Sequence, residues 1–402
     1  MSQVNTTATL NGLFKELYAD SIVNLQPDNA IMQKLVKFRE SEMLGKKYNQ
    51  PIILASEQGV TYLAAGDGAQ TLNSSIAATM ANAEIDGSQI FIRGQIDYEA
   101  MSKASKSKSS FKNATELMVE NLMDSASKRL EIAMLYGGSG IATVSSLASQ
   151  VITLTTASFA SGIWAGMENC VIDVYTSGGS VRQAGLVVAS VDLDARTVTV
   201  TGTTTGIVST DVVYFKGAYG KEMAGLNKII TNTGTLFGIS AASFALWAGS
   251  SYVVGGALTM AKVLSAVGKA VAKGGLNEDV VLLCNPITWQ NLNSDQASLR
   301  NYVDKDSKAQ NGFEAIEYRS QNGKISIIAS SYIKEGEAFI FPPKRCRRIG
   351  SSEMTFKTPG RDGEFFLHLP DTNAVEIRLY ANQSLFLEAP AKAVKLTGIV
   401  NS

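Results

Sequence analysis

Side chains that commonly carry out catalysis are few in this chain and stand far apart. The only histidine among its 402 residues is His368, in the strand-like stretch FFLHLP. A lone histidine on a strand is far more often a packed or surface residue than a catalyst. Serine and cysteine nucleophiles need a base, usually histidine, and the Gly-x-Ser-x-Gly turn of the α/β-hydrolases is absent. We therefore predict no catalytic residue and no enzyme activity.

Metal and cofactor motifs are equally weak. The cysteines are odd in number and widely spaced: Cys170, Cys284 and Cys346. They form neither a disulfide framework nor a metal pair, which favours assembly in a reducing cytosol. The stretch GDGAQT at 66–71 lacks the third glycine of a dinucleotide loop, so we interpret it as a turn. Asp192 and Asp194 indicate a hairpin turn rather than a calcium loop. We predict no metal and no cofactor.

Two basic clusters could contact nucleic acid. One precedes a helical segment in a Ser-rich linker and comprises Lys103, Lys106, Lys108 and Lys112. The other comprises Lys344, Arg345, Arg347 and Arg348, and is better interpreted as a solvated turn or as salt bridges. Neither cluster is flanked by aromatic residues that could stack on bases. The 36 basic and 36 acidic residues cancel, so no global charge attracts nucleic acid or anionic membrane.

Charged residues make up only 18% of the chain, against about 25% in ordinary soluble domains. None occurs between Glu131 and Glu168 or between Lys228 and Lys262, which suggests that much surface is buried against partners. The N-terminus has no signal-peptide pattern. The best membrane candidate, 236–258, is interrupted by serines and glycines, whereas a span needs roughly 20 apolar residues. We predict no membrane association.

The N-terminal segment predicts short amphipathic helices. Leu10, Leu13, Phe14, Leu17 and Tyr18 recur at helical spacing, and Pro27 separates them from a second helical piece around 30–38. Isolated helices of fewer than about 12–15 residues are marginal. These helices therefore need a partner surface.

Residues 48–102 form a lysine-free, strand-like ribbon in which Arg93 is the only basic residue. A helical period then runs from Asn113 to Tyr136, with Asn113 and Glu116 resembling a capping box and Gly137-Gly138 as its stop. The ribbon has too little apolar content for a core of its own, and an exposed one would aggregate. We expect it to lie on a neighbouring copy of the chain.

The second half of the chain alternates β and mixed segments. Five or six short strands at 151–219 predict a small inserted barrel or sandwich. A helix ending near Lys273, a buried strand at 279–284, a helix after Asn285-Pro286, and strands at 325–329 and 338–341 predict an α+β unit. The segment 354–387 is β again.

This order of elements resembles the major capsid proteins of tailed phages, with the Hong Kong 97-like fold. Two local stretches support the resemblance: GKKYNQPIIL with EQGVTYL at 45–63, and MAGLNKIITNTGTLFGIS with FALWAG at 223–249. The resemblance implies an α+β capsid fold with an inserted small β-barrel. The expected parts are an N-terminal arm (1–47), an extended loop (48–102), a spine helix and first part of the peripheral domain (103–150), the inserted β domain (151–220), an axial α+β domain (221–350) and a peripheral β-sheet return (351–402).

The resemblance implies a structural protein of the virion that is assembled in the host cytoplasm. Copies would form hexamers and pentamers of an icosahedral head around double-stranded DNA, with separate scaffolding, portal and decoration proteins. Some members join subunits through a loop lysine, which residues 48–102 lack. Assembly contacts are expected at Leu13, Phe14, Leu17, Tyr62, Ile90 and Ile92. Weak, non-specific DNA contact is expected at Lys103, Lys106, Lys108 and Lys112.

Two alternatives remain at this point. A cellular nanocompartment shell, as in encapsulins, has the same kind of fold, although the β insertion and the long arm speak against it. A β-rich carbohydrate-active enzyme is more distant, since paired carboxylates can act without histidine.

Overall fold

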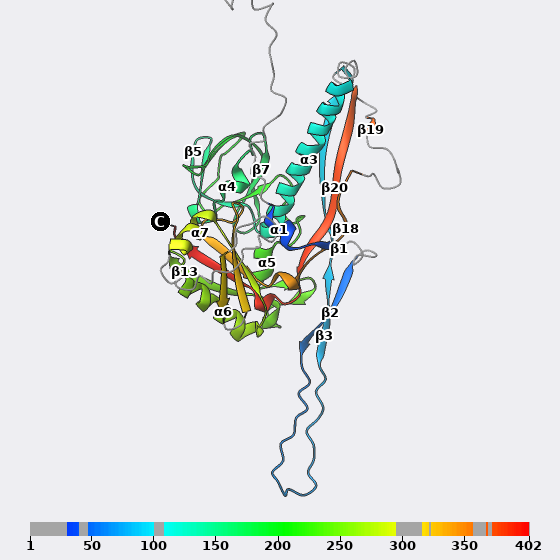
Figure 1. The fold of residues 1–402 in the computed structure, drawn as a ribbon, viewed down its shortest axis with the longest axis vertical. Helices are drawn as coiled ribbons and strands as arrows, with labels where there is room; N and C mark the ends of the chain where they lie inside the picture. The colour runs from blue at the N-terminus through cyan, green and yellow to red at the C-terminus, as the bar shows by residue number, and fades with distance from the viewer. Residues whose placement is uncertain are drawn as a thin grey trace, which may run out of the picture.

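The computed structural model describes residues 30–39, 47–99, 108–294, 316–320, 323–356, 367–368 and 372–401; up to residue 117, only the backbone of the long helix is described. The fold is α+β, as predicted from the sequence. A rounded body carries two projections (Figure 1): a long helix lying along long strands, and a thin two-stranded ribbon that extends the other way.

The long helix is α3, Lys108–Tyr136. It begins before the predicted start at Asn113, so Asn113 and Glu116 lie inside the helix and the capping-box interpretation is wrong. Lys108 and Lys112 are helical rather than part of a linker. At the other end, Gly137 N donates to Ala133 O and Gly138 has φ +71°. The predicted glycine stop is confirmed.

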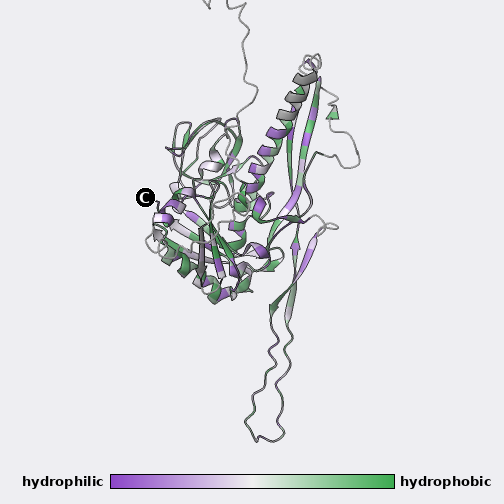
Figure 2. Ribbon diagram, viewed as in Figure 1, coloured by the Kyte–Doolittle hydropathy of each residue, from purple (hydrophilic) through white to green (hydrophobic). Residues whose placement is uncertain are grey.

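A long sheet runs beside α3. Strand β20 (Ala374–Leu387) pairs antiparallel with β18 (Cys346–Thr355) on one side and with β4 (Ser88–Asp97) on the other. The short strands β1 (Phe38–Arg39) and β19 (Leu367–His368) extend this sheet. Strand β4 belongs to the second half of the predicted ribbon. It pairs with β20 of its own subunit, whereas all of 48–102 was expected to lie on a neighbouring copy. A pairing partner about 280 residues away in sequence draws β4 into the body. Hydrophilic and hydrophobic residues alternate along β20 (Figure 2).

Six strands close into a barrel in the order β10-β5-β6-β9-β8-β7. They are β5 (Ala142–Ala148), β6 (Val151–Leu154), β7 (Val171–Tyr175), β8 (Val181–Asp192), β9 (Thr197–Thr201) and β10 (Val212–Phe215). The barrel therefore begins before the predicted boundary at residue 151. The turn expected at Asp192 is confirmed, because its Oδ1 accepts hydrogen bonds from the backbone N–H groups of Asp194 and Ala195. The segment between β6 and β7 holds η3 (Thr156–Ser158) and α4 (Ser161–Trp164).

A second sheet has the order β13-β21-β17-β14-β16-β15. Its strands are β13 (Ser250–Gly256), β21 (Val394–Ile399), β17 (Glu337–Phe341), β14 (Val280–Cys284), β16 (Gly323–Ala329) and β15 (Ile316–Ser320). Helices α6 (Met260–Gly274) and α7 (Pro286–Ser294) fall where the sequence predicts them, and Asn285 Oδ1 accepts from Ile287 N at 3.0 Å. The predicted boundary at residue 351 is wrong on both sides, because β21 belongs to this sheet and β18 to the long one.

The remaining described elements are short. They are α1 (Ile31–Leu35), β2 (Tyr48–Ala55), β3 (Thr79–Ile85), α5 (Leu226–Ile230), β11 (Thr235–Leu236), β12 (Ile239–Ser240), η4 (Ala245–Trp247), η6 (Pro343–Arg345) and η7 (Pro390–Lys392).

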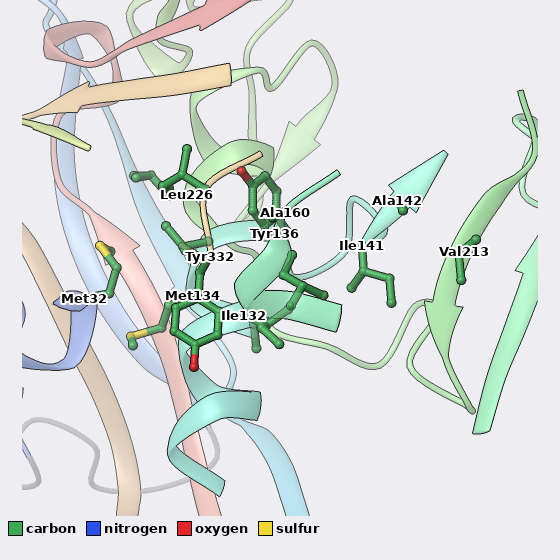
Figure 3. Packing of buried hydrophobic residues seen from close by; sticks show 14 of the residues in the cluster. Met32, Ile132, Met134, Tyr136, Ile141, Ala142, Ala160, Val213, Leu226 and Tyr332 are labelled. Carbon is green, nitrogen blue, oxygen red and sulfur yellow. The ribbon is translucent and has the colours of Figure 1, made fainter. Parts of the chain in front are cut away.

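The main core surrounds the last two turns of α3. Ile132, Met134 and Tyr136 are buried there (Figure 3), in one cluster with Met32 of α1, Leu226 of α5, Tyr332 and the barrel interior. A separate apolar cluster fills the space between α6 and the six-stranded sheet. The end of α3 thus joins the N-terminal segment, the barrel and the second sheet.

We expect Gly137→Ala to destabilise the subunit. A Cβ at Gly137 would lie 2.4 Å from the carbonyl oxygens of Ala133 and Met223, and backbone at this joint can move little. Overpacking of this kind costs about 1–3 kcal/mol in the free energy of unfolding, measurable by urea denaturation. Gly268→Ala is the matched control, because Gly268 is exposed on α6 with open space around its Cβ position. It should stabilise by about 0.5–1 kcal/mol. Equal stability of Gly137→Ala and wild type would contradict this account.

Candidate assembly surface

The projecting ribbon is built from β2 and β3, which pair antiparallel from Tyr48 opposite Ile85 to Ala55 opposite Thr79. Side chains along β2 alternate between half-buried and exposed. The base of the ribbon is fixed to the body, because Ala83 and Ile85 pack in a small core with Trp247 and Phe386. The strands therefore leave the body in a defined direction (Figure 1).

Beyond these strands lies the projecting loop, residues 56–78, which has almost no core of its own. Tyr62 is 91% exposed. A few bonds hold the two arms together, among them Gln58 N to Ile76 O at 3.1 Å and Asn73 N to Thr61 Oγ1 at 2.8 Å. Its large exposed apolar side chains are Val60, Tyr62, Leu63, Leu72 and Ile76. Burying each of these side chains would contribute about 1.5–3 kcal/mol of favourable free energy. Contact with a partner surface would therefore stabilise the loop substantially.

The predicted contact residues divide between two environments. Tyr62 is exposed on the projecting loop, as an interface residue would be. Ile90 and Ile92 are half-buried on the face of β4 that packs towards α3, where a Cβ at Gly94 would meet Met118 and Leu122. These two isoleucines pack within their own subunit, and their expected contact with a neighbouring copy stays a prediction.

The opposite face of β4 presents Phe91, which is 62% exposed and contacts Tyr380 at 4.7 Å between ring centroids. The sequence carried a signal for it. Phe91 alternates with Ile90 and Ile92 at the two-residue period of a strand, so it had to lie on the other face.

The other predicted residues cannot be placed in the same way. Leu13, Phe14, Leu17, Lys103 and Lys106 lie outside the described residues. For Lys108 and Lys112 only the helical backbone is described, and β19 places His368 without its side chain.

The basic cluster after Pro342-Pro343 is engaged within the subunit. Arg345 forms ion pairs with Glu278 and Glu388, and Arg347 with Glu388. Arg345 and Lys392 hold the pKa of the Glu278 carboxyl at about 2, well below its usual range. The salt-bridge interpretation of this cluster is confirmed.

Arg348, the fourth member, is buried and holds three segments together. It donates to Gln383 Oε1 at 2.9 Å, Val36 O at 3.3 Å and Glu353 Oε1 at 2.8 Å. Burial lowers its pKa. The contact with Val36 ties the segment after α1 to the long sheet.

Glu131, near the end of α3, holds the beginning of α1. Its carboxylate is fully buried and accepts from the backbone N–H groups of Met32 at 2.7 Å and Gln33 at 3.3 Å. A carboxylate suits a helix N-terminus because unpaired N–H groups point outward there. Sequence reasoning missed this residue, since no local pattern distinguishes it from the exposed acids of a helix.

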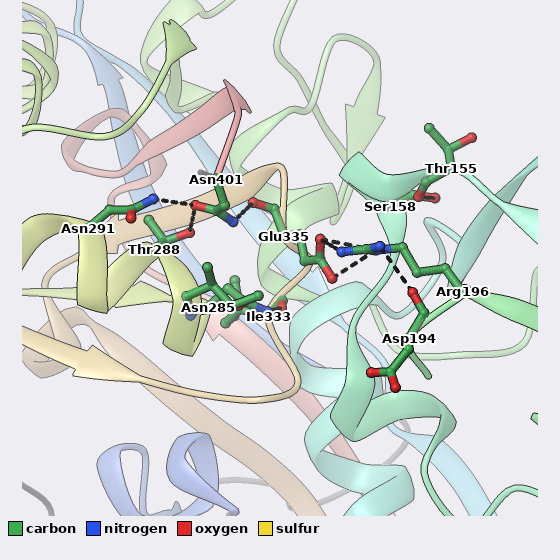
Figure 4. Close-up of polar contacts among 11 residues, drawn as sticks. Thr155, Ser158, Asp194, Arg196, Asn285, Thr288, Asn291, Ile333, Glu335 and Asn401 are labelled. Atoms are coloured by element: carbon green, nitrogen blue, oxygen red, sulfur yellow. Dashed lines mark hydrogen bonds and ion pairs between the residues drawn. The ribbon is translucent and has the colours of Figure 1, made fainter. Parts of the chain in front are cut away.

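A second polar network joins the barrel to the six-stranded sheet (Figure 4). Arg196 follows the Asp192 turn. Its guanidinium forms a bidentate salt bridge with the Glu335 carboxylate, with N–O distances of 2.9–3.2 Å. Glu335 O accepts from Asn401, whose Oδ1 in turn accepts from Thr288 of α7. The barrel is therefore fixed to the body rather than hinged freely.

The base of the ribbon borders a polar cleft of about 370 Å³ lined by both charge signs, including Lys47, Glu84, Asp86 and Lys221. Lys47 bonds Glu84 at 2.6 Å, which raises the lysine pKa and lowers that of the carboxyl. In the described part of the chain, no group of three His, Cys, Asp or Glu side chains is arranged to hold a metal ion. No helix in the same ranges has the length and apolarity needed to cross a membrane.

We expect the stability of the subunit to depend on the proton of Glu131. Burial raises its pKa from the ordinary 4.5 to about 7, so the folded subunit binds this proton more tightly than the unfolded chain. The resulting stability is complete below about pH 4.5 and is lost as the pH rises through about 7, with an upper bound of about 3 kcal/mol.

Urea denaturation between about pH 4.5 and 8 measures this dependence. In Glu131→Gln the neutral side chain keeps an acceptor for Met32 N. The unfolding free energy of this variant should therefore fall much less than that of wild type as the pH rises. Glu120→Gln, on the exposed face of α3, is the control and should show the same pH dependence of the unfolding free energy as wild type. Parallel curves for wild type and Glu131→Gln would show that Glu131 does not titrate in this range.

Comparisons with known proteins bear on the whole chain. Residues 208–364 match the family model described as SU10 major capsid protein. No curated protein matches the chain at a significant level. Among solved structures, the cyanophage A-1(L) capsid asymmetric unit is 12% identical with a TM-score of 0.59, covering 98% of this chain and 99% of that one. The capsid of the native GTA particle is 7% identical with a TM-score of 0.54, covering 99% and 100%.

A structure of Mycobacterium phage Bobi is 13% identical with a TM-score of 0.50, covering 99% of both chains. At these identities the structural matches establish the fold, and the family model adds the type of protein. The projecting ribbon fits both. The chain therefore has the fold of phage capsid proteins along its length, and its residues 208–364 match a family of major capsid proteins.

Proposed function

We propose that this protein self-assembles into the hexamers and pentamers of an icosahedral phage head that encloses double-stranded DNA. The observation that carries the proposal is the projecting loop, whose apolar side chains extend beyond any surface of their own subunit. In a shell, that loop would lie on an adjacent copy, and its apolar burial would drive assembly.

In this assignment α3 is the spine helix, the β4-β20-β18 sheet is the peripheral domain, and the six-stranded sheet is the axial domain. The barrel is an inserted domain fixed by Arg196 and Glu335. Residues 1–47 would form an N-terminal arm that contacts a neighbour through Leu13, Phe14 and Leu17. Scaffolding, portal and decoration proteins would be separate chains, the role would be structural rather than enzymatic, and the finished particle would be the virion, assembled in the host cytoplasm.

Electron microscopy of the purified protein tests the proposal. Closed shells are expected, and particles from infected cells should contain DNA. The nanocompartment alternative predicts shells filled with a cargo enzyme instead, and the match to a phage capsid family favours the first outcome. A protein that remains monomeric under all assembly conditions would contradict both.

We expect the shells to be held by non-covalent contacts alone. Residues 48–102 contain no lysine for an isopeptide bond, and Cys284 and Cys346 are buried as free thiols. Mature particles boiled in SDS without reductant should give one band near 42.8 kDa. A ladder of covalent oligomers is the contrary result.

Lys103, Lys106, Lys108 and Lys112 are proposed to contact packaged DNA weakly. Such contacts would position phosphate without reading sequence, and salt would screen them over about 8–10 Å. Replacing all four with Gln should leave empty-shell assembly intact and lower the stability of DNA-filled particles more at low salt than at high salt. Particle stability can be followed by thermal release of DNA. Identical release from wild type and variant at every salt concentration would show that these lysines only solvate the helix start or pair with carboxylates.

A further inference from the structure

The six-stranded sheet has an outer edge at β13. In the described part of the chain, β13 pairs with one strand, β21, in parallel. Alternate residues of a parallel strand bond the same neighbour. Because Ser250 N donates to Ala393 O of the β21 side, the backbone groups of Ser251 and Val253 point to the outer edge. An edge of this kind is a template on which another chain can add a strand.

Lysine side chains of α6 bond the backbone oxygens along this edge. The ammonium groups of Lys262, Lys269 and Lys273 donate to Ala257 O at 2.9 Å, Ser251 O at 2.9 Å and Gly249 O at 2.7 Å, respectively. The three lysines stand seven and four positions apart, so they lie on one face of the helix. Gly249 and Ser251 are alternate residues, and their oxygens are acceptors that an added strand would need.

The ammonium groups also make an added strand unfavourable in a second way. Lys269 lies over the Tyr252 ring, with its nitrogen 5.3 Å from the ring centroid, which holds the side chain along β13. A strand that paired with β13 would displace these groups from their acceptors and remove water from around them. Desolvating a charge without a new partner costs free energy, and lysine is a common means of protecting edge strands for this reason.

The far end of β13 is irregular. Its register with β21 shifts between Val253 and Gly256, and Gly255 and Gly256 have φ of +60° and +138°. A bulge of this kind bends the strand and ends the surface available for pairing. Val253 stands between the bulge and the oxygen bonded by Lys269, and its side chain is 72% exposed. It is the position at which pairing would begin if the ammonium groups were removed.

We propose that Lys262, Lys269 and Lys273 cover the outer edge of the six-stranded sheet and prevent a second copy of the chain from pairing its own β13 there. The excluded partner is a second copy because every subunit carries the same edge, and two identical edges can pair antiparallel around a two-fold axis. Such a dimer would compete with productive association. The inference goes beyond the proposed shell function, since it concerns the free subunit.

The test removes the ammonium groups and keeps most of each side-chain stem. Replacing Lys262, Lys269 and Lys273 together with Met should tighten association between free subunits by about tenfold or more. Sedimentation velocity measures this below the concentration at which wild type forms shells. Hydrogen exchange should show new protection of the Ser251 and Val253 amides in the associated species. Lys269→Met alone, at an exposed position of α6, should act in the same direction and serves if the triple variant folds poorly.

Two control variants separate the lysine bonds from net charge. Replacing the same three lysines with Arg keeps cationic donors and should leave association as in wild type. Replacing three exposed lysines elsewhere with Met removes the same charge and should not increase association; these are Lys37, Lys216 and Lys221.

Substitutions at Val253 separate strand pairing from a simple apolar contact. Added to the triple Met variant, Val253→Pro removes the outward N–H at a position where an edge strand tolerates proline, so association should return to within about twofold of wild type. Val253→Thr in the same background removes the apolar side chain but keeps the N–H. Association should therefore persist in that variant.

Any of three results would overturn the inference. They are association of the triple Met variant and of Lys269→Met no stronger than that of wild type, equal association of the variant lacking Lys37, Lys216 and Lys221, and rescue by Val253→Thr as complete as by Val253→Pro. None of these results bears on whether wild type forms shells, so failure of the inference and failure of the proposed function are distinguishable.

Discussion

The buried end of α3 is the constraint on which the rest of the subunit depends. Its last two turns contribute Ile132, Met134 and Tyr136 to one core that also receives side chains from α1, α5, the barrel and Tyr332. Because these parts are packed against the same turns, they cannot move independently. The glycines that follow let the chain leave the helix where a side chain would collide with backbone. The rigid body then holds the two projections at fixed angles, which a closed shell of repeated copies requires.

Burial at this joint also has electrostatic consequences. Lys334 is buried against the Tyr136 ring and donates to Gly140 O, and burial lowers its pKa to about 8. Glu131 and Arg348 place opposite charges beside α1. A carboxylate, an ammonium and a guanidinium thus stand where apolar residues would cost less desolvation. Each of the three bonds at least one backbone group of a particular segment, so these side chains specify which segments meet there.

Local features of the fold were predictable, and distant pairings were not. The C-terminal end of α6, the Asn285 cap and the glycine stop of α3 depend on residues within a few positions, and the sequence predicted them correctly. The start of α3 was predicted too late because Asn113 resembles a helix cap. No local feature of the sequence indicates that the helix already begins at Lys108. The position of β4 depends on its pairing with β20, about 280 residues later in the chain. Because no local pattern records that pairing, the sequence of β4 could not be distinguished from the rest of the ribbon.

The candidate surface shows the same division. The exposure of Tyr62 agrees with a segment that has too little apolar content for a core of its own. Which face of β4 carries Ile90 and Ile92 could not be read from the sequence, because it depends on the pairing of β4 with β20. Glu131 and Arg348 belong to residue types that are normally exposed, and only tertiary structure reveals that they are buried.

The placement of β21 has a consequence for synthesis. This strand lies between β13 and β17, parallel to one and antiparallel to the other, and Ser250 pairs with Val394. The ribosome makes β13, α6, β14, β16 and β17 well before residues 394–399 emerge. Until then β13 has no neighbour in its sheet, and the sheet remains divided. A chain interrupted before β21 would therefore expose two unpaired strand edges rather than a nearly finished subunit. Late insertion of a central strand thus delays a subunit's competence to join its neighbours until most of its length has been translated.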